Sequence, residues 1–207
     1  MLYILVKYFW LAVISFRQPI RLFGRENIPR KGAFLFVANH LSSNDPFLLA
    51  AGTRRHLAFM GKASLFRHPV AGFIMRGLNA FPVDRDADPR AVLEKTVEIL
   101  RGGRPTTMFP EGSRNKVDTS LREFKKGAAL VAVKAGVPVL PAAILGTRNK
   151  EEPITVLYGK PIFPPENTRE GIRAFNEEMH QAVQACLEEL RPLHARRLEA
   201  RKGRQKA

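Results

Sequence analysis

The stretch that decides the fold is AFLFVANHLSSNDP, residues 33–46. Its first six residues are apolar and predict a buried strand, which ends at a small polar turn. Ligands and catalytic groups of α/β proteins gather at such strand ends. In this turn His40 precedes Asp45 by five positions. A carboxylate that reaches one ring nitrogen of a histidine makes the other nitrogen a better general base, so the pair could deprotonate a hydroxyl. The alternative is a turn histidine capped by a nearby carboxylate.

Short apolar strands and helices alternate along the rest of the chain. Strands are expected at residues 57–60, 78–83, 106–109, 137–144 and 154–158, and helices at 69–76, 88–102, 123–135 and 172–190. This alternation predicts an α/β fold, a single domain with a mostly parallel central sheet flanked by helices. The length of 207 residues fits one domain with a sizeable core.

Composition limits the classes of partner. The net charge is +15, so the chain should seek anionic partners such as phospholipid headgroups, nucleic acid or an acidic protein. The single cysteine, Cys186, rules out an internal disulfide and any multi-cysteine metal site. It lies on the apolar stripe of the last helix, which favours a place in the core over a role as nucleophile.

Residues 1–24 are expected to form a membrane-interface helix. The first sixteen residues are apolar except for Lys7 and Ser15. That is short of the ~20 residues needed to span a bilayer. Five cations follow, and aromatic residues suit the headgroup region: Arg17, Arg21, Arg25, Arg30, Lys31, Tyr3, Tyr8 and Trp10. The pattern predicts a monotopic helix that enters one leaflet, and the alternative is a core helix docked on the domain.

The C-terminal end is strongly basic. Residues 191–207 contain seven Lys or Arg and one acid, Glu199. Such a tail is usually solvated or frayed, and the functional alternative is attachment to anionic lipid. We therefore expect three regions: the helix at 1–24, a domain at 25–191 and a basic tail at 192–207.

A second polar segment, FPEGSRN at residues 109–115, also follows a strand directly. Gly112 lets a backbone approach a ligand closely. Ser113 and Arg114 can donate hydrogen bonds to a phosphate or carboxylate, and Glu111 can accept one from a ligand hydroxyl. The alternative is a surface turn with a local Glu–Arg pair. Two more cations, Lys62 and Arg85, stand at the predicted ends of other strands.

Four segments in this order resemble the lysophosphatidate acyltransferase family of glycerolipid acyltransferases. The first matches the family's His-x4-Asp motif, and residues 109–114 match its Phe-Pro-Glu-Gly-Thr-Arg motif with Ser113 in place of Thr. Residues 62–85 resemble the second block, although Ser64 stands where many members carry Glu. Residues 137–144 resemble the fourth block. The resemblance covers about residues 25–165.

The resemblance implies a role for each candidate residue. His40 would be the general base on the acceptor hydroxyl, oriented by Asp45, and the hydroxyl would attack an acyl thioester without a covalent acyl-enzyme. Neither a metal nor a cofactor is needed, because a thioester is already activated. The remaining site residues fall into two groups: Lys62, Arg85 and Arg114 would hold the acceptor phosphate, and Glu111, Gly112 and Ser113 would position its glycerol.

The expected partners are therefore an acyl donor, acyl-CoA or acyl carrier protein, together with a lysophospholipid and an anionic membrane surface. The expected product is phosphatidate, and the expected place is the cytoplasmic face of the cell membrane, as a peripheral or monotopic protein. One alternative is the same chemistry on another lysophospholipid or lipid acceptor. Another is a non-catalytic basic module that binds membrane or nucleic acid. Nucleic acid is not expected, because the aromatic residues sit mostly in apolar runs rather than among the cations.

Overall fold

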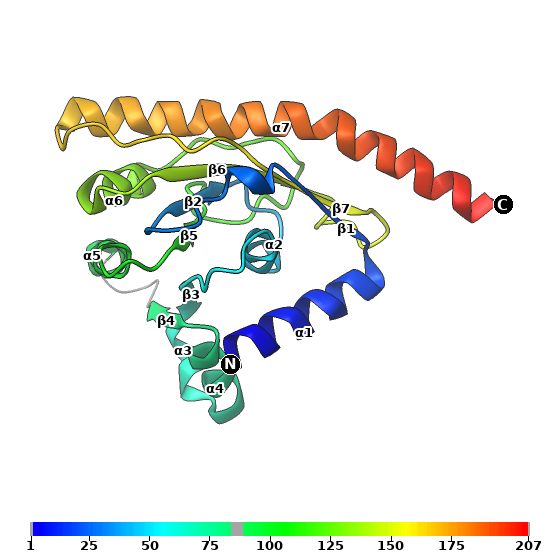
Figure 1. Cartoon of the computed structure of the whole chain (residues 1–207), viewed down its shortest axis with the longest axis horizontal. Coiled ribbons are helices and arrows are strands. Elements are labelled where there is room, and N and C mark those ends of the chain that lie inside the picture. Colours follow the sequence, from blue (N-terminus) through cyan, green and yellow to red (C-terminus); the bar gives the residue numbers. More distant parts are fainter. Residues whose placement is uncertain (1, 84–88, 207) are drawn as a thin grey trace.

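A five-stranded sheet forms the centre of the molecule (Figure 1). The structure is a computed structural model and describes residues 2–83 and 89–206. The strands, in the order β1-β7-β6-β2-β5, are β1 (Ile20–Phe23), β7 (Ile154–Tyr158), β6 (Val139–Leu145), β2 (Leu35–Ala38) and β5 (Thr106–Met108). Neighbouring strands are parallel except β6 and β7, which are antiparallel. The predicted α/β domain with a mostly parallel sheet is confirmed.

Two features of the sheet were not predicted. The strand β1 has only four residues, none of them fully buried, and its pairing with β7 joins residues far apart in the sequence. The strands β3 (Phe59–Lys62) and β4 (Ala80–Val83) form a separate parallel pair rather than joining the main sheet. A bridge between Ala58 and Thr106 connects this small sheet to β5. The connection from β3 to β4 consists of two short helices, α3 (Ala63–Arg67) and α4 (Pro69–Gly77).

Helices cover both faces of the sheet. The long helix α7 (Arg169–Lys206) lies along one side of the molecule, with α5 (Pro89–Arg101) and α6 (Gly127–Ala135) at one end of the sheet (Figure 1). Its inner side buries Phe175, Met179, Val183, Cys186, Leu187 and Leu190. The core position predicted for Cys186 is therefore confirmed. The 3-10 turn η1 (Arg25–Asn27) and α2 (Asp45–Ala51) complete the domain.

The basic C-terminal end is helical, not frayed, as far as Lys206. Pro192 lies inside α7, where a proline would ordinarily break a helix. Just beyond it the buried His194 ring lies 2.9 Å from Thr155 Oγ1 and 3.4 Å from Glu152 Oε2. These contacts fix α7 to β7 and to the preceding loop. The regional boundary predicted at residue 192 is thus not marked by a change in secondary structure.

The N-terminal helix α1 (Leu2–Arg17) docks on the domain through one face only. Tyr3, Lys7, Leu11 and Ile14 are buried there. The opposite side carries large exposed apolar residues, which we call the outer face of α1: Ile4, Leu5, Tyr8, Phe9, Val13 and Phe16. The helix is therefore docked on the domain and still leaves an apolar face uncovered, and its predicted contact with a membrane stays a prediction. Within residues 2–83 and 89–206 no helix is long and apolar enough to cross a membrane.

Candidate functional site

The site begins where β2 ends, and Asn39 extends that strand. The Asn39 side chain donates from Nδ2 to the Ile144 carbonyl at 2.8 Å and accepts from the Ile144 N–H at 2.8 Å. The side-chain amide thus pairs with both backbone groups of one residue of β6, which continues the contact between β2 and β6 past the end of β2. Because Asn39 is almost fully buried, both bonds are shielded from water. The next residue, His40, therefore leaves the sheet at a fixed point.

His40 and Asp45 meet as the sequence predicted. His40 Nδ1 lies 2.9 Å from Asp45 Oδ2. The same oxygen accepts from the backbone N–H groups of Leu41 and Ser42, each at 2.7 Å. Three donors and the start of α2 hold the buried carboxylate in place. An ionised carboxylate can only accept, so His40 carries its proton on Nδ1 and has Nε2 available as a base. The His40 side chain is 16% exposed, so it is reachable from outside.

The turn after β5 forms hydrogen bonds with both the N–H and the carbonyl of His40. The His40 N–H donates to Glu111 Oε1 at 2.8 Å, and the His40 carbonyl accepts from the Asn115 N–H at 2.7 Å. The His40 ring stacks on Phe109, with centroids 4.0 Å apart and planes 15° from parallel. The two segments predicted to carry chemistry, 39–45 and 109–115, therefore form one site.

Glu111 and Ser113 are themselves held by Arg122. Arg122 Nε donates to Glu111 Oε2 at 3.0 Å, and its Nη2 contacts Ser113 through the backbone carbonyl and Oγ. Glu111 is buried, and each of its oxygens accepts from a protein donor. In this structure it orients His40; the glycerol contact predicted for it remains a prediction.

Gly112 and Arg114 belong to the same turn. Gly112 has φ +78°, and a Cβ there would lie 2.9 Å from Lys125 Cε and Nζ, so only glycine fits without strain. Arg114 is exposed, and its Nη1 donates to Ser43 Oγ at 2.8 Å, directly beside the His40 turn. A cation therefore stands beside the His40 turn, and its predicted contact with an acceptor phosphate stays a prediction.

The other two predicted phosphate-binding cations, Lys62 and Arg85, are not seen beside His40 among the described residues. Lys62 is exposed at the end of β3, in the two-stranded sheet and not in the sheet that carries His40. Arg85 lies outside the described residues. Their predicted contact with an acceptor phosphate therefore stays a prediction.

Two further elements fix the Asp45 side of the site. Tyr158, fully buried at the end of β7, donates to the carbonyls of Leu48 or Leu49 and accepts from the Gly52 N–H, which anchors the end of α2. Burial raises the pKa of the Tyr158 hydroxyl well above its usual range. From the other side, α1 contacts the turn: Trp10 Nε1 donates to Asn44 Oδ1 at 3.2 Å, and its ring lies 5.9 Å from that of Phe47.

The sequence analysis did not identify Asn39, Arg122 or Trp10 as parts of this site. Asn39 had a usable signal, because a buried strand continues into it and an asparagine there needs partners. Arg122 and Trp10 had none, since they are 82 and 30 residues from His40 and carry no motif of their own. Only the fold brings them to the site.

Comparisons with known proteins point to one family. A family model described as Acyltransferase matches residues 19–145, which include both segments of the site. The chain is 25% identical to a 1-acyl-sn-glycerol-3-phosphate acyltransferase of Bacillus subtilis over 83% of this chain and 90% of that protein. It is 32% identical to the protein of that name from Borreliella burgdorferi over 68% of this chain, although this spans only 55% of the relative.

A similar solved structure points to the same family. The crystal structure of the 1-acyl-sn-glycerophosphate (LPA) acyltransferase PlsC from Thermotoga maritima superposes with a TM-score of 0.71 and 29% sequence identity. The match covers 89% of this chain and 78% of that one. Two chloroplast relatives, from Brassica napus and Arabidopsis thaliana, are 38% identical, but the chain spans only 36% of their length.

Proposed function

This chain belongs to the lysophosphatidate acyltransferase family, and from that premise we propose that it moves a fatty acyl group from an acyl thioester to the free hydroxyl of lysophosphatidate, giving phosphatidate. The observation that carries the proposal is the His40–Asp45 pair at the end of β2. Its ring is oriented from three sides, by Asp45, Phe109 and the turn that holds its backbone.

The proposed step is direct transfer. His40 Nε2 accepts the proton of the acceptor hydroxyl while the hydroxyl oxygen attacks the thioester carbonyl carbon. The tetrahedral intermediate collapses by breaking the carbon–sulfur bond, and the thiolate takes the proton back from Nε2. Asp45 stabilises the imidazolium that exists between the two transfers. General-base catalysis of this kind is worth ~10² to 10⁴ in rate.

The acceptor phosphate is assigned to cations around this turn. Arg114 lies beside Ser43, within the same turn as His40. A guanidinium can bind a phosphate through two parallel hydrogen bonds, so Arg114 would hold the acceptor with its hydroxyl toward His40. Lys62 and Arg85 are proposed as further phosphate ligands, on the resemblance of residues 62–85. Gly112 and Ser113 would place the glycerol, with Glu111 supporting them.

The proposed acyl donor is acyl-CoA or acyl carrier protein, and the proposed place is the cytoplasmic face of the membrane, with α1 as the anchor. The exposed apolar residues on the outer face of α1 support membrane contact. The cations that follow α1 favour the cytoplasmic side. The contact from Trp10 to Asn44 supports this proposal, because α1 lies beside the site, where a lipid acceptor would enter.

The test is an assay of the purified protein with a panel of acceptors and both donors. Lysophosphatidate, other lysophospholipids and monoacylglycerol would be offered with acyl-CoA or acyl carrier protein, and products would be identified by mass spectrometry. We expect phosphatidate from lysophosphatidate. Efficient transfer to another lysolipid with none to lysophosphatidate would reassign the acceptor. No transfer to any acceptor, with RNA or vesicles raising the thermal midpoint instead, would favour a binding module.

A further inference from the structure

The pair of short helices between β3 and β4 presents an apolar surface that the proposed reaction does not use. Leu65 of α3 is 43% exposed, and Val70 and Phe73 of α4 are 63% and 60% exposed. Val70 and Phe73 are three positions apart and so share one face of α4, and Leu65 lies on α3, which packs against α4. Exposed large apolar side chains on two adjoining helices indicate an interaction surface. We call these three residues the tip of the α3–α4 pair.

The tip is held in a defined position, because glycines allow close packing behind it. A Cβ on Gly61 would lie 2.8 Å from the Phe66 ring, and one on Gly72 would lie 2.6 Å from the Phe66 carbonyl oxygen. Phe66 is thus held between β3 and α4 and fastens the pair. Phe66 turns inward while its neighbour Leu65 remains exposed.

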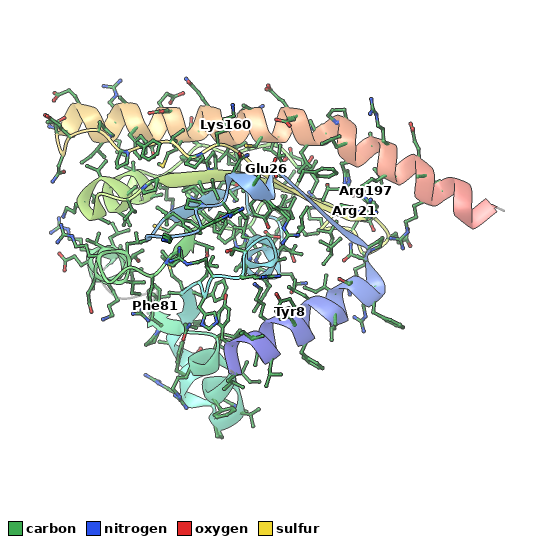
Figure 2. All side chains as sticks on the ribbon, viewed as in Figure 1. Tyr8, Arg21, Glu26, Phe81, Lys160 and Arg197 are labelled. Atoms are coloured by element: carbon green, nitrogen blue, oxygen red, sulfur yellow. The ribbon has the colours of Figure 1, made fainter. Side chains whose placement is uncertain are left out.

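The tip adjoins α1. A Cβ on Gly77, the last residue of α4, would lie 2.4 Å from Leu2 Cδ2, so the end of α4 packs directly against the start of α1. Both helices lie on the side of the molecule away from α7 (Figure 1). In Figure 2 carbon-rich side chains project from α1 on the side away from the sheet. The outer face of α1 and the tip therefore belong to one side of the molecule.

The charge of this side fits an anionic partner. Residues 1–25 and 46–83, which include α1, α3 and α4, contain no Asp or Glu. Arg17, Arg67 and Arg76 stand in the last turns of α1, α3 and α4. The one lysine of α1, Lys7, points inward, where its Nζ donates to the Thr53 carbonyl and burial lowers its pKa to about 8. An uncharged apolar face bordered by cations suits the interface of a bilayer with anionic headgroups.

We propose that α3 and α4 are a second membrane-docking element, which inserts Leu65, Val70 and Phe73 into the same leaflet as the outer face of α1. The occupant is one leaflet of a bilayer that contains anionic phospholipid. The inference rests on the proposed function, because a lipid acceptor would be drawn from that leaflet. Two separate insertions fix the tilt of the domain as well as its depth, and the His40 turn touches α1 through Trp10. The site would then face the leaflet at one angle.

Vesicle co-sedimentation without substrate tests the proposal independently of catalysis. Phe73→Ser should weaken partition onto phosphatidylglycerol-containing vesicles about tenfold or more. The matched control is Phe163→Ser, because Phe163 is also an exposed phenylalanine, at 72%, but lies between β7 and α7. Phe163→Ser should bind as the wild type does. Equal binding by Phe73→Ser and the wild type, with both folded, would overturn the proposal.

Fluorescence quenching locates the tip directly. Trp10 is the only tryptophan, so Phe73→Trp in a Trp10→Phe background carries a single probe on α4, and Phe163→Trp in that background is the control. Brominated lipids in the vesicles should quench the probe at position 73 and leave the one at 163 unquenched. An unquenched probe at 73 on vesicle-bound protein would contradict the proposal. So would a dimer in lipid-free solution that Phe73→Ser converts to monomer, since a second copy would then cover the tip.

Discussion

The turn at residues 39–45 contacts α1 through the hydrogen bond from Trp10 to Asn44, yet the turn and the outer face of α1 are built in opposite ways. In the turn, buried polar groups are held by the protein itself, through Asn39, Asp45 and Glu111. On the outer face of α1, large apolar side chains are left uncovered, with Phe16 at 93% exposure. Burying polar groups costs free energy unless they are paired, and exposing apolar groups costs free energy unless something covers them.

This contrast suggests that the turn and the outer face of α1 have separate roles, the first in the proposed reaction and the second in the proposed membrane contact. A turn that is held by several buried hydrogen bonds keeps one geometry, as the proposed proton transfer requires. An uncovered apolar face is instead suited to an apolar partner from outside the chain, and the partner that we propose is a leaflet that holds the acceptor. Changes in the turn should therefore damage the reaction with every acceptor, whereas changes on the outer face should damage only delivery from a membrane.

The largest effect is expected at the base itself. His40→Ala should lower kcat by ~10² to 10⁴, because the acceptor hydroxyl loses its proton acceptor. The variant should stay folded, because the backbone N–H groups of Leu41 and Ser42 still donate to Asp45. Activity would be measured with acceptor in vesicles and in monomeric form, and both should fall alike. Near-full activity in folded His40→Ala would exclude the general-base role.

A smaller and more selective effect is expected at Arg114, beside the His40 turn. Arg114→Ala should raise KM for lysophosphatidate roughly ten- to a hundredfold, because a hydrogen bond to a charged group contributes about 1.5–3 kcal/mol. Monoacylglycerol, which has no phosphate, should be affected far less. Lys150→Ala, which removes another exposed cation from the loop before β7, is the control and should change neither constant. Equal losses on both acceptors would remove Arg114 from phosphate binding.

The hydrogen bonds from the Asn39 side chain to Ile144 can be tested by measuring the free energy of unfolding. Asn39→Ala leaves the buried N–H and carbonyl of Ile144 without partners, which should cost about 1–3 kcal/mol. For a chain of this size the thermal midpoint should fall by about 2–4 °C for each kcal/mol. Urea unfolding would measure the change, and kcat should fall as well because His40 follows directly. An unchanged midpoint would show that the amide does not secure the turn.

The smallest effect is expected at the cysteine. Cys186 is buried on α7, and burial raises the pKa of its thiol to about 11, so it is a neutral thiol at pH 7. Cys186→Ser should leave kcat unchanged and at most lower stability through a buried hydroxyl. Loss of activity in a folded variant, with an acyl-thioester trapped on the wild type, would replace direct transfer by a covalent route.

Much of this architecture could be predicted from sequence. Local patterns gave the alternation of strands and helices, and the resemblance gave a family that the comparisons confirm. The His40–Asp45 pairing was predicted because both residues lie in one turn. Contacts across the fold could not be predicted, because no local pattern encodes them: Arg122 reaches Glu111 from the next segment, and Tyr158 holds the end of α2 from β7. The short strand β1 was not predicted for the same reason, since only its pairing with β7 makes it a strand.

The most direct test of the two roles is one rate comparison with two acceptors. A short-chain lysophosphatidate that is monomeric in water would be compared with a long-chain one embedded in anionic vesicles, for wild type, His40→Ala and the double variant Phe9→Ser/Phe16→Ser. Phe9 and Phe16 are 66% and 93% exposed, so the double variant changes the outer face of α1 and leaves the core intact. We predict that it keeps the wild-type rate on the monomeric acceptor and loses most of its rate on vesicles, while His40→Ala fails on both. Equal loss by the double variant on both acceptors, or an active His40→Ala, would contradict the separation of chemistry from membrane access.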